Sequence, residues 1–274
     1  MKRAFITGAL VILLLGFFAS AGLTQESNGT SAKPDAASII DRMTQALEPK
    51  LPSVRVMTLT VKSARGSVVE WKLAQARADV DGTKWMLTVV LLPPSAKGIA
   101  LLDVNKPSTG AVEHVYLPAV KRMRQFTPLQ AWEPFFGSDF SYQDFIFPRP
   151  TDRVKLKGTE THEGAACYRL EEALSKNPYF SKVETWVAVD SGLPVERDYY
   201  DLQGKLYKAE HYEHVMTIQN IPTITKVVMK NVQQGGSSEI KVTSVKYDKE
   251  APKKLFDPNN LSKAADDQFW KSTM

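Results

Sequence analysis

The chain has 274 residues, of which 43% are hydrophobic and 24% charged, and it contains a single cysteine. Its formal net charge of +5 arises from 35 basic and 30 acidic residues that are interleaved along the chain. This distribution is typical of a solvated surface and does not favour a nucleic-acid-binding function. With one cysteine, placed far from the N-terminus, we expect neither an intramolecular disulfide nor a lipid anchor.

The N-terminal segment has the pattern of a cleavable signal peptide. A short basic stretch precedes an apolar run over residues 4–18, and Ala19-Ser20-Ala21 has the small residues that signal peptidase accepts. The apolar run is shorter than the ~20 residues that a membrane span needs. The predicted organisation is therefore a signal peptide over residues 1–21, a flexible leader over residues 22–33 and one domain over residues 34–274 of an exported, periplasmic protein.

One amphipathic helix is predicted at the start of this domain. Asp35 is a residue type that favours a helix N-terminus, and Pro49 ends the helical pattern. Between them, apolar side chains recur on one helix face. These side chains, which we expect to pack over a sheet, are Ile39, Ile40, Met43 and Leu47.

Strand patterns dominate the rest of the chain. Runs rich in Val, Leu, Thr and aromatic residues are separated by Gly, Pro, Asn and Asp. Tight reversals are predicted at 201–204 and 234–237, so antiparallel hairpins are expected. The predicted strands are 54–62, 67–80, 83–92, 98–104, 112–117, 153–157, 165–172, 181–189, 194–202, 205–218, 223–232 and 238–248.

The strand over residues 67–80 has apolar side chains on both faces. Trp71 and Leu73 lie on one face, whereas Ala74 and Ala76 lie on the other, which indicates either a β-bulge or a sheet covered on both sides. We predict a mainly β fold in which a single strongly curved antiparallel sheet of about 11 strands forms an incomplete β-barrel, with the N-terminal helix and short lid helices. Periodicity leaves a β-sandwich as the alternative.

No motif for catalysis, a cofactor or a metal is present. His211 and His214 fall on opposite faces of a predicted strand, so we expect no shared metal there. Asp139 and Asp144 are interpreted as turn-stabilising residues. Cys167 is expected to be a small hydrophobic strand residue, with a partner disulfide or a nucleophile as the alternatives.

Residues 115–145 combine a predicted hairpin with an unusually aromatic segment. The hairpin carries Lys121, Arg122 and Arg124, which suit either contact with an acidic membrane or partner surface, or protection of an edge strand. The aromatic segment is punctuated by Pro134 and Gly137. We interpret it as a lid.

The same stretch resembles a known family. VYLPAVKRMRQF followed by FFGSDFSYQDF resembles the central signature of the outer-membrane lipoprotein-sorting protein family, which includes relatives of the carrier LolA and its receptor LolB. Similar segments run from about residue 70 to residue 263. The residues that match the signature are Tyr116, Pro118, Lys121, Arg124, Gly137, Ser138, Asp139, Phe140, Ser141, Tyr142 and Asp144.

This resemblance implies an incomplete antiparallel barrel with helices over its open side and a hydrophobic cavity that holds acyl chains. Members of the broader group are often associated with inner-membrane exporters of the resistance-nodulation-division type. Candidate cavity residues on strands are Trp71, Leu73, Trp85, Leu87, Leu101, Tyr116, Met123 and Phe126. Candidate lid residues, besides the helix face, are Trp132, Phe135, Phe136, Phe140, Tyr142, Phe145 and Phe147.

We therefore expect a monomeric, non-catalytic periplasmic carrier that moves lipids or acylated lipoproteins between the inner and outer membranes. The expected partners are this cargo, a transporter of the resistance-nodulation-division type and an outer-membrane acceptor. The alternative is a lipid-sensing or accessory subunit of such an exporter. A lipid hydrolase would need a nucleophile beside a base, which the sequence does not indicate.

Overall fold

The computed structural model describes residues 34–272, except 107, 109, 128–129, 146–152 and 176. The predicted signal peptide, the leader and Phe147 lie outside the described residues. All elements below belong to the unit Pro34–Met274. Among the helices described, none has the length and hydrophobicity to span a membrane.

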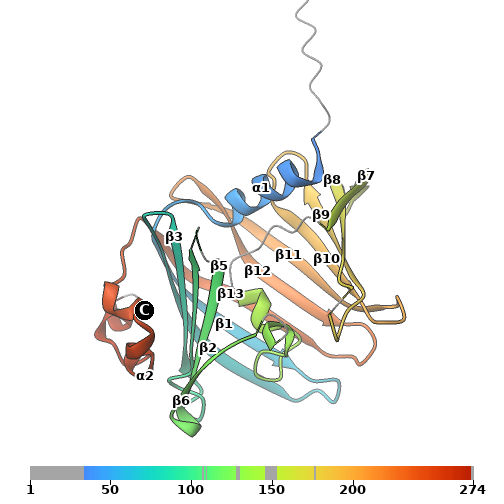
Figure 1. Cartoon of the computed structure of the whole chain (residues 1–274). Coiled ribbons are helices and arrows are strands. Elements are labelled where there is room, and N and C mark those ends of the chain that lie inside the picture. The colour runs from blue at the N-terminus through green and yellow to red at the C-terminus, as the bar shows by residue number, and fades with distance from the viewer. Residues whose placement is uncertain are drawn as a thin grey trace, which may run out of the picture. The chain divides into compact units, whose positions relative to one another are not determined.

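The strands form one antiparallel sheet (Figure 1). Its order is β6-β5-β4-β3-β2-β1-β13-β12-β11-β10-β9-β8-β7. The strands are β1 Ser53–Lys62, β2 Val68–Val80, β3 Thr83–Leu92, β4 Ala100–Lys106, β5 Gly110–Leu117, β6 Arg122–Gln125, β7 Val154–His162, β8 Ala165–Ala173, β9 Lys182–Ala188, β10 Pro194–Tyr200, β11 Leu206–Ile218, β12 Ile221–Asn231 and β13 Ser237–Tyr247.

Strand neighbours in the sheet are also neighbours in sequence, with one exception, the pairing of β1 with β13. The chain therefore leaves the sheet at one edge, β6, and re-enters it at the other edge, β7. The prediction of a single open antiparallel sheet is confirmed, and the β-sandwich alternative is excluded because every described strand belongs to one sheet. The sheet has 13 strands rather than about 11, since β6 in particular is too short to give a period-two pattern.

Helix α1, Ala36–Leu47, is the predicted amphipathic helix. The Asp35 carboxylate caps it by accepting the Ser38 N–H at 2.8 Å. Its apolar face packs against Leu170 and Val187 of the sheet. Arg42 donates to the Val189 carbonyl at 2.6 Å and to the Asp190 carbonyl, so the helix is tied to the turn between β9 and β10. The buried side chains of this face are Ile39, Ile40 and Met43.

The convex side of the first half of the sheet is covered by a C-terminal helical segment (Figure 1). Its Trp270 is 1% exposed and donates its indole N–H to the Ala264 carbonyl at 2.7 Å. Ala74 and Ala76 of β2 are buried beneath this segment, whereas Leu73 faces the concave core. Coverage of both faces thus explains the pattern of 67–80. The register between β2 and β3 also shifts between Lys72 and Leu73, as at a β-bulge, so both sequence-based explanations are present. The segment comprises η4 Lys253–Phe256, η5 Pro258–Asn260, α2 Leu261–Ala264 and η6 Gln268–Ser272.

Candidate functional site

The aromatic segment, which comprises the described residues 126–127 and 130–145, lies over the concave face of the sheet (Figure 1). It contains two short 3-10 helices, η2 Gln130–Trp132 and η3 Tyr142–Phe145. Phe135 stacks on Phe145 with ring centroids 4.1 Å apart, and Phe136 stacks on Trp71 of β2 at 5.2 Å. The segment is thus packed into the core of the concave side.

Two aspartates of the signature hold this segment in place. The Asp139 N–H donates to Ser238 Oγ at 2.9 Å, and Ser238 Oγ donates back to Asp139 Oδ2 at 2.8 Å. Asp144 accepts both the N–H and the hydroxyl of Ser141, at 2.7 and 2.9 Å. Asp144 therefore stabilises its own turn as predicted, but Asp139 anchors the segment to β13 instead of binding local turn backbone.

A buried lysine strengthens the same anchor. Lys208 of β11 is 3% exposed and donates to the Asp139 carbonyl at 2.7 Å. Its ammonium lies 4.4 Å from the ring centroid of Tyr199 and 5.3 Å from that of Phe180, which compensates for part of the desolvation of the charge. The aromatic segment is thus tied to the strands beneath it.

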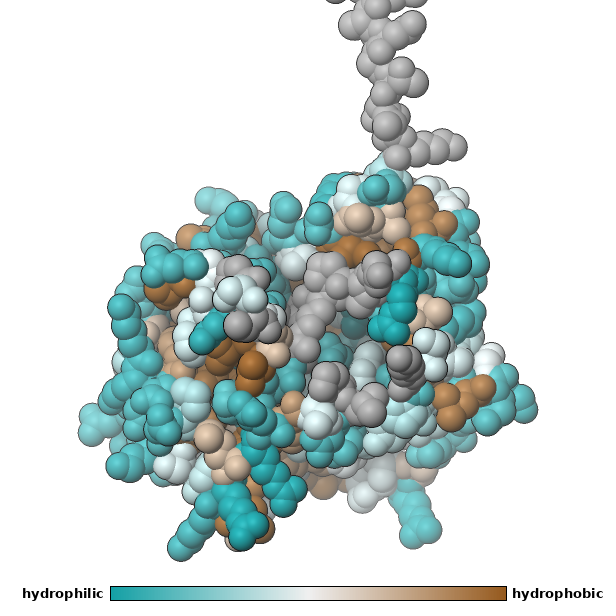
Figure 2. Space-filling view, in the orientation of Figure 1, coloured by the Kyte–Doolittle hydropathy of each residue, from teal (hydrophilic) through white to brown (hydrophobic). Residues whose placement is uncertain are grey.

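Beside the aromatic segment the concave side contains a cavity of about 460 Å³. Its walls come from α1, from the aromatic segment and from strands of both halves of the sheet. In Figure 2, hydrophobic side chains gather near α1, while the margins of this face are hydrophilic. The apolar lining consists of Ile40, Met43, Leu47, Met57, Trp132, Phe140, Phe145, Val154, Leu170, Leu174, Val183, Ile224, Val227, Ile240 and Val242.

The cavity also has a polar wall, which the prediction of a hydrophobic cavity did not include. Arg197 Nη1 lies 3.5 Å from Glu210 Oε2. The Tyr199 hydroxyl lies 3.2 Å from both Asp144 Oδ1 and Glu210 Oε2. Burial raises the pKa of Glu210, while the nearby Arg197 opposes this shift. These groups therefore provide most of one another's hydrogen-bond and ion-pair partners.

Arg55 is different, because its Nε is buried without a hydrogen-bond partner. It lines the cavity from β1, next to Arg77 on β2, which donates to the Leu47 carbonyl at 3.1 Å. Burial, with the charge of Arg77 in addition, lowers the pKa of Arg55 to about 9. The cavity wall therefore carries a guanidinium whose Nε–H has no acceptor among the described residues.

The predicted cavity and lid residues fall into distinct places. Trp132, Phe140 and Phe145 line the cavity, as do three residues of the predicted helix face, Ile40, Met43 and Leu47. A second set packs in or against the concave core beside the cavity: Trp71, Leu73, Leu101, Phe126, Phe135, Phe136 and Tyr142.

The remaining predicted cavity residues lie elsewhere. Trp85, Leu87 and Tyr116 pack on the convex side against the C-terminal segment, and Met123 is 44% exposed on β6. The strand period separates the two faces correctly but does not tell which face is concave, and this face was assigned wrongly on β3 and at Tyr116. Val90 of β3 and Val115 of β5, which lie on the other face of these strands, occupy the concave core instead.

The basic cluster and the cysteine also have defined positions. Lys121, Arg122 and Arg124 are exposed at the edge strand β6 and the turn before it. Cys167 of β8 is 0% exposed, and burial raises the pKa of its thiol. The polar wall of the cavity was missed, although Arg197 and Tyr199 alternate on β10 as residues of one face would.

Comparisons with known proteins agree with this architecture. A family model with the description "Uncharacterized protein" matches residues 82–263. No curated protein matches the chain significantly. Three crystal structures are similar over 82% of this chain.

The first is a putative outer membrane lipoprotein-sorting protein domain from Vibrio parahaemolyticus, with 22% identity, a TM-score of 0.73 and 97% of its chain covered. The second is a DUF1329 family protein from Desulfovibrio piger, with 23% identity, a TM-score of 0.73 and 97% covered. The third is a LolA superfamily protein from Nitrosomonas europaea, with 18% identity, a TM-score of 0.65 and 98% covered. At these identities the similarity shows a shared fold.

Proposed function

This chain belongs to the family whose model, described as an uncharacterized protein, matches residues 82–263, and we propose that it is a periplasmic carrier of acyl lipids or acylated lipoproteins. A shared fold alone does not assign a function, because one fold can serve many. The proposal is carried by one observation. The concave side holds a cavity of about 460 Å³ that is largely apolar and has in its wall the guanidinium of Arg55, whose Nε lacks a hydrogen-bond partner.

The physical chemistry of this cavity suits an anionic amphiphile. Each methylene group that moves from water into an apolar site contributes ~0.8 kcal/mol, so an acyl chain gains most from walls such as Met57, Val183 and Ile240. A carboxylate or phosphate would accept a charge-assisted hydrogen bond from Arg55. Transport requires no catalysis, because release follows when an acceptor binds the lipid more strongly.

The proposed membrane contact is the β5–β6 tip. Lys121, Arg122 and Arg124 are exposed there beside Val120 and Met123, which are 52% and 44% exposed. Basic side chains next to apolar ones favour binding to an anionic membrane surface, because both the charge and the hydrophobic contacts contribute. The same residues would also discourage edge-to-edge pairing of β6. An exporter of the resistance-nodulation-division type and an outer-membrane acceptor remain the proposed protein partners.

The proposal is tested by the lipid content of protein extracted gently from its native periplasm. Native mass spectrometry should find about one acyl lipid per chain, and the loaded protein should transfer it to acceptor vesicles. Stoichiometric lipid without transfer would favour the alternative, a lipid-sensing or accessory subunit of an exporter. Protein that is empty, and that takes up no lipid from donor vesicles, would contradict both functions.

A further inference from the structure

A histidine- and carboxylate-rich cluster lies on the outer face of strands β7 to β11. His211 Nδ1 is 3.6 Å from both Glu163 Oε1 and Glu196 Oε2. These three ligand atoms all lie within 4.8 Å of one another. A fourth residue, His162, places its Nε2 2.7 Å from Glu196 Oε2.

The fold brings these residues together from separate strands. Glu196 of β10 is directly opposite His211 of β11 in the antiparallel register. Glu163 lies in the turn between β7 and β8, where its φ of 46° is left-handed. Because Arg197 and Tyr199 point into the cavity, the strand alternation turns Glu196 and Asp198 to the opposite side. The cluster is therefore separated from the cavity by the sheet.

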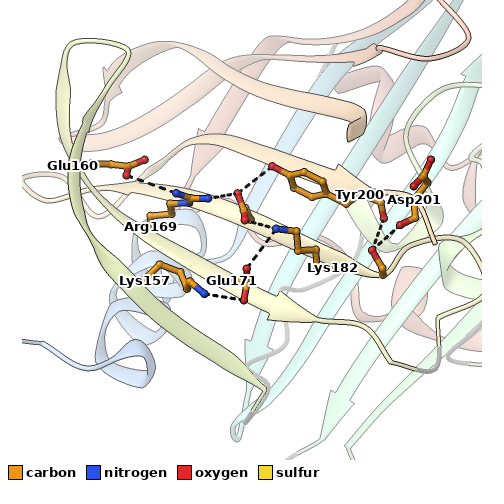
Figure 3. A network of polar contacts seen from close by, with 9 residues as sticks. Lys157, Glu160, Arg169, Glu171, Lys182, Tyr200 and Asp201 are labelled. Carbon is orange, nitrogen blue, oxygen red and sulfur yellow. Dashed lines mark hydrogen bonds and ion pairs between the residues drawn. The ribbon is translucent and has the colours of Figure 1, made fainter. Parts of the chain in front are cut away.

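Other acidic side chains on this face are neutralised by neighbouring cations (Figure 3). Glu171 pairs with Lys157 and Lys182, at 3.2 and 3.4 Å. Glu184 pairs with Arg169 at 2.9 Å and with Lys182 at 2.6 Å. These pairs leave the neighbouring cluster without a cation of its own.

Within the described part of the chain, no lysine or arginine forms an ion pair with Glu163, Glu196 or Asp198. The basic side chains that contact these carboxylates are those of His162 and His211. Such a concentration of carboxylates on one surface is unfavourable unless a cation or a bound proton neutralises it. The local charge thus points to a positively charged ligand.

Asp198 supplies an independent indication. It is only 8% exposed, and its Oδ1 is buried without a hydrogen-bond partner. An unpaired buried carboxylate oxygen costs free energy unless a ligand satisfies it. It lies next to the cluster, on the same face of β10.

We propose that Glu163, Glu196 and His211 bind a divalent transition-metal cation of the Zn²⁺ class. Bonds of ~2.0–2.1 Å in a tetrahedral site place ligand atoms roughly 3.3 Å apart. The two 3.6 Å separations therefore need a small closure, and the two carboxylate oxygens, which lie within 4.8 Å of each other, must close to a similar distance. Imidazole nitrogen with carboxylate oxygen suits Zn²⁺ better than Ca²⁺ or Mg²⁺, which prefer oxygen ligands alone.

His162 is a positioning residue for this site. Its ring stacks on Trp186 with centroids 4.3 Å apart, and its Nε2–H donates to Glu196. Outer hydrogen bonds of this kind orient a ligating carboxylate. The cation would join the β7–β8 turn to β10 and β11, and this site is independent of the proposed lipid cavity.

The test is titration of the untagged, chelator-treated protein with Zn²⁺ and with Co²⁺ alone. One equivalent should bind, and Co²⁺ should give the visible absorption of a tetrahedral nitrogen–oxygen site. His211→Asn and Glu163→Gln should weaken binding at least about tenfold, as should His162→Asn. Glu163 has a side chain that is 52% exposed, so its replacement is expected to leave the fold intact.

His214→Asn, on the same strand, is the matched control and should bind the cation as the unaltered protein does. Bound Zn²⁺ should also raise the melting temperature of the unaltered protein and not that of His211→Asn. The proposal is overturned if no stoichiometric binding occurs, or if both His211→Asn and Glu163→Gln bind with unchanged affinity.

Discussion

Ser238 and Asp139, which are 99 residues apart in sequence, bind each other through two hydrogen bonds that run in opposite directions. One joins the Asp139 N–H to Ser238 Oγ at 2.9 Å, and the other joins the Ser238 hydroxyl to the Asp139 carboxylate at 2.8 Å. Ser238 is 0% exposed, so both bonds are shielded from water. They fix the aromatic segment to the centre of the sheet.

Ser238→Ala should therefore destabilise the protein by about 1.5–3 kcal/mol, the usual contribution of a hydrogen bond to a charged group. The measurement is urea unfolding followed by circular dichroism. Ser237→Ala, on the neighbouring residue of β13 and less buried, is the control and should change stability by less than about 0.5 kcal/mol. Equal effects of the two substitutions would show that the contact with Asp139 does not hold the segment.

Arg55 should determine the preference of the cavity for an anionic headgroup. Arg55→Leu removes the buried donor and leaves a shorter, apolar side chain, so affinity for a fatty acid should fall about tenfold, as for loss of one charge-assisted bond. Affinity for the corresponding fatty alcohol should change much less. Both are measured by displacement of a fluorescent lipid.

Arg65→Leu, in the exposed turn after β1, removes the same charge far from the cavity and should leave both affinities unaltered. If Arg55→Leu and the unaltered protein discriminate equally between acid and alcohol, Arg55 does not bind the headgroup.

Glu48 should make stability depend on pH. It is 7% exposed, and burial raises its pKa above the ordinary glutamate value of 4.5, although Arg77 and Lys84 oppose the shift. Because the folded state holds this proton more tightly than the unfolded state, the stability contribution is greatest below pH 4.5 and is lost as the pH rises through the folded-state pKa.

Glu48→Gln should remove this dependence. Relative to the unaltered protein, the variant should gain stability between pH 4.5 and pH 7 in urea unfolding. Glu70→Gln, at an exposed position of β2, serves as the control. Its stability relative to the unaltered protein should not change with pH. If the stability of Glu48→Gln relative to the unaltered protein instead falls as the pH rises, the pKa of Glu48 is not raised in the folded state.

Cys167 should behave as a packing residue. It is fully buried, and its raised pKa leaves little thiolate near neutral pH. Iodoacetamide should modify it slowly in the native protein and rapidly in urea, and Cys167→Ala should retain lipid binding. Rapid alkylation of the native protein would instead favour the nucleophile or partner-disulfide interpretations.

The sequence contained enough information for the sheet, the helix and the hairpins. These features depend on local signals, such as apolar runs bounded by Gly, Pro, Asn and Asp and the Asp35 cap of α1, which the fold keeps. The strand β6 was not predicted separately, because four exposed residues have no buried face to reveal a period.

The site was harder to predict, since it depends on which strands meet. The alternation of side chains along β3 correctly places Trp85 and Val90 on opposite faces of the sheet. Which face is convex depends on the C-terminal segment, whose Trp270 belongs to the cluster that covers the Trp85 face. Similarly, Glu196 and His211 become neighbours through the β10–β11 register, and Glu163 joins them from a turn. No spacing within a single strand could indicate that cluster.

The central claim is that the concave cavity holds an acyl chain, and two adjacent substitutions on β13 test it most directly. Ile240 lines the cavity, whereas Lys241 is exposed and faces the other side. Ile240→Trp should fill the space that an acyl chain would occupy and reduce bound lipid at least about tenfold, while Lys241→Trp should bind like the unaltered protein.

Both variants should retain the far-ultraviolet circular dichroism of a β protein, so that lost binding is not lost folding. The measurement is the amount of a fluorescent fatty acid bound per chain at saturation. We predict near-stoichiometric binding for the Lys241→Trp variant and the unaltered protein, and little for Ile240→Trp. Full binding by a folded Ile240→Trp variant would contradict the account.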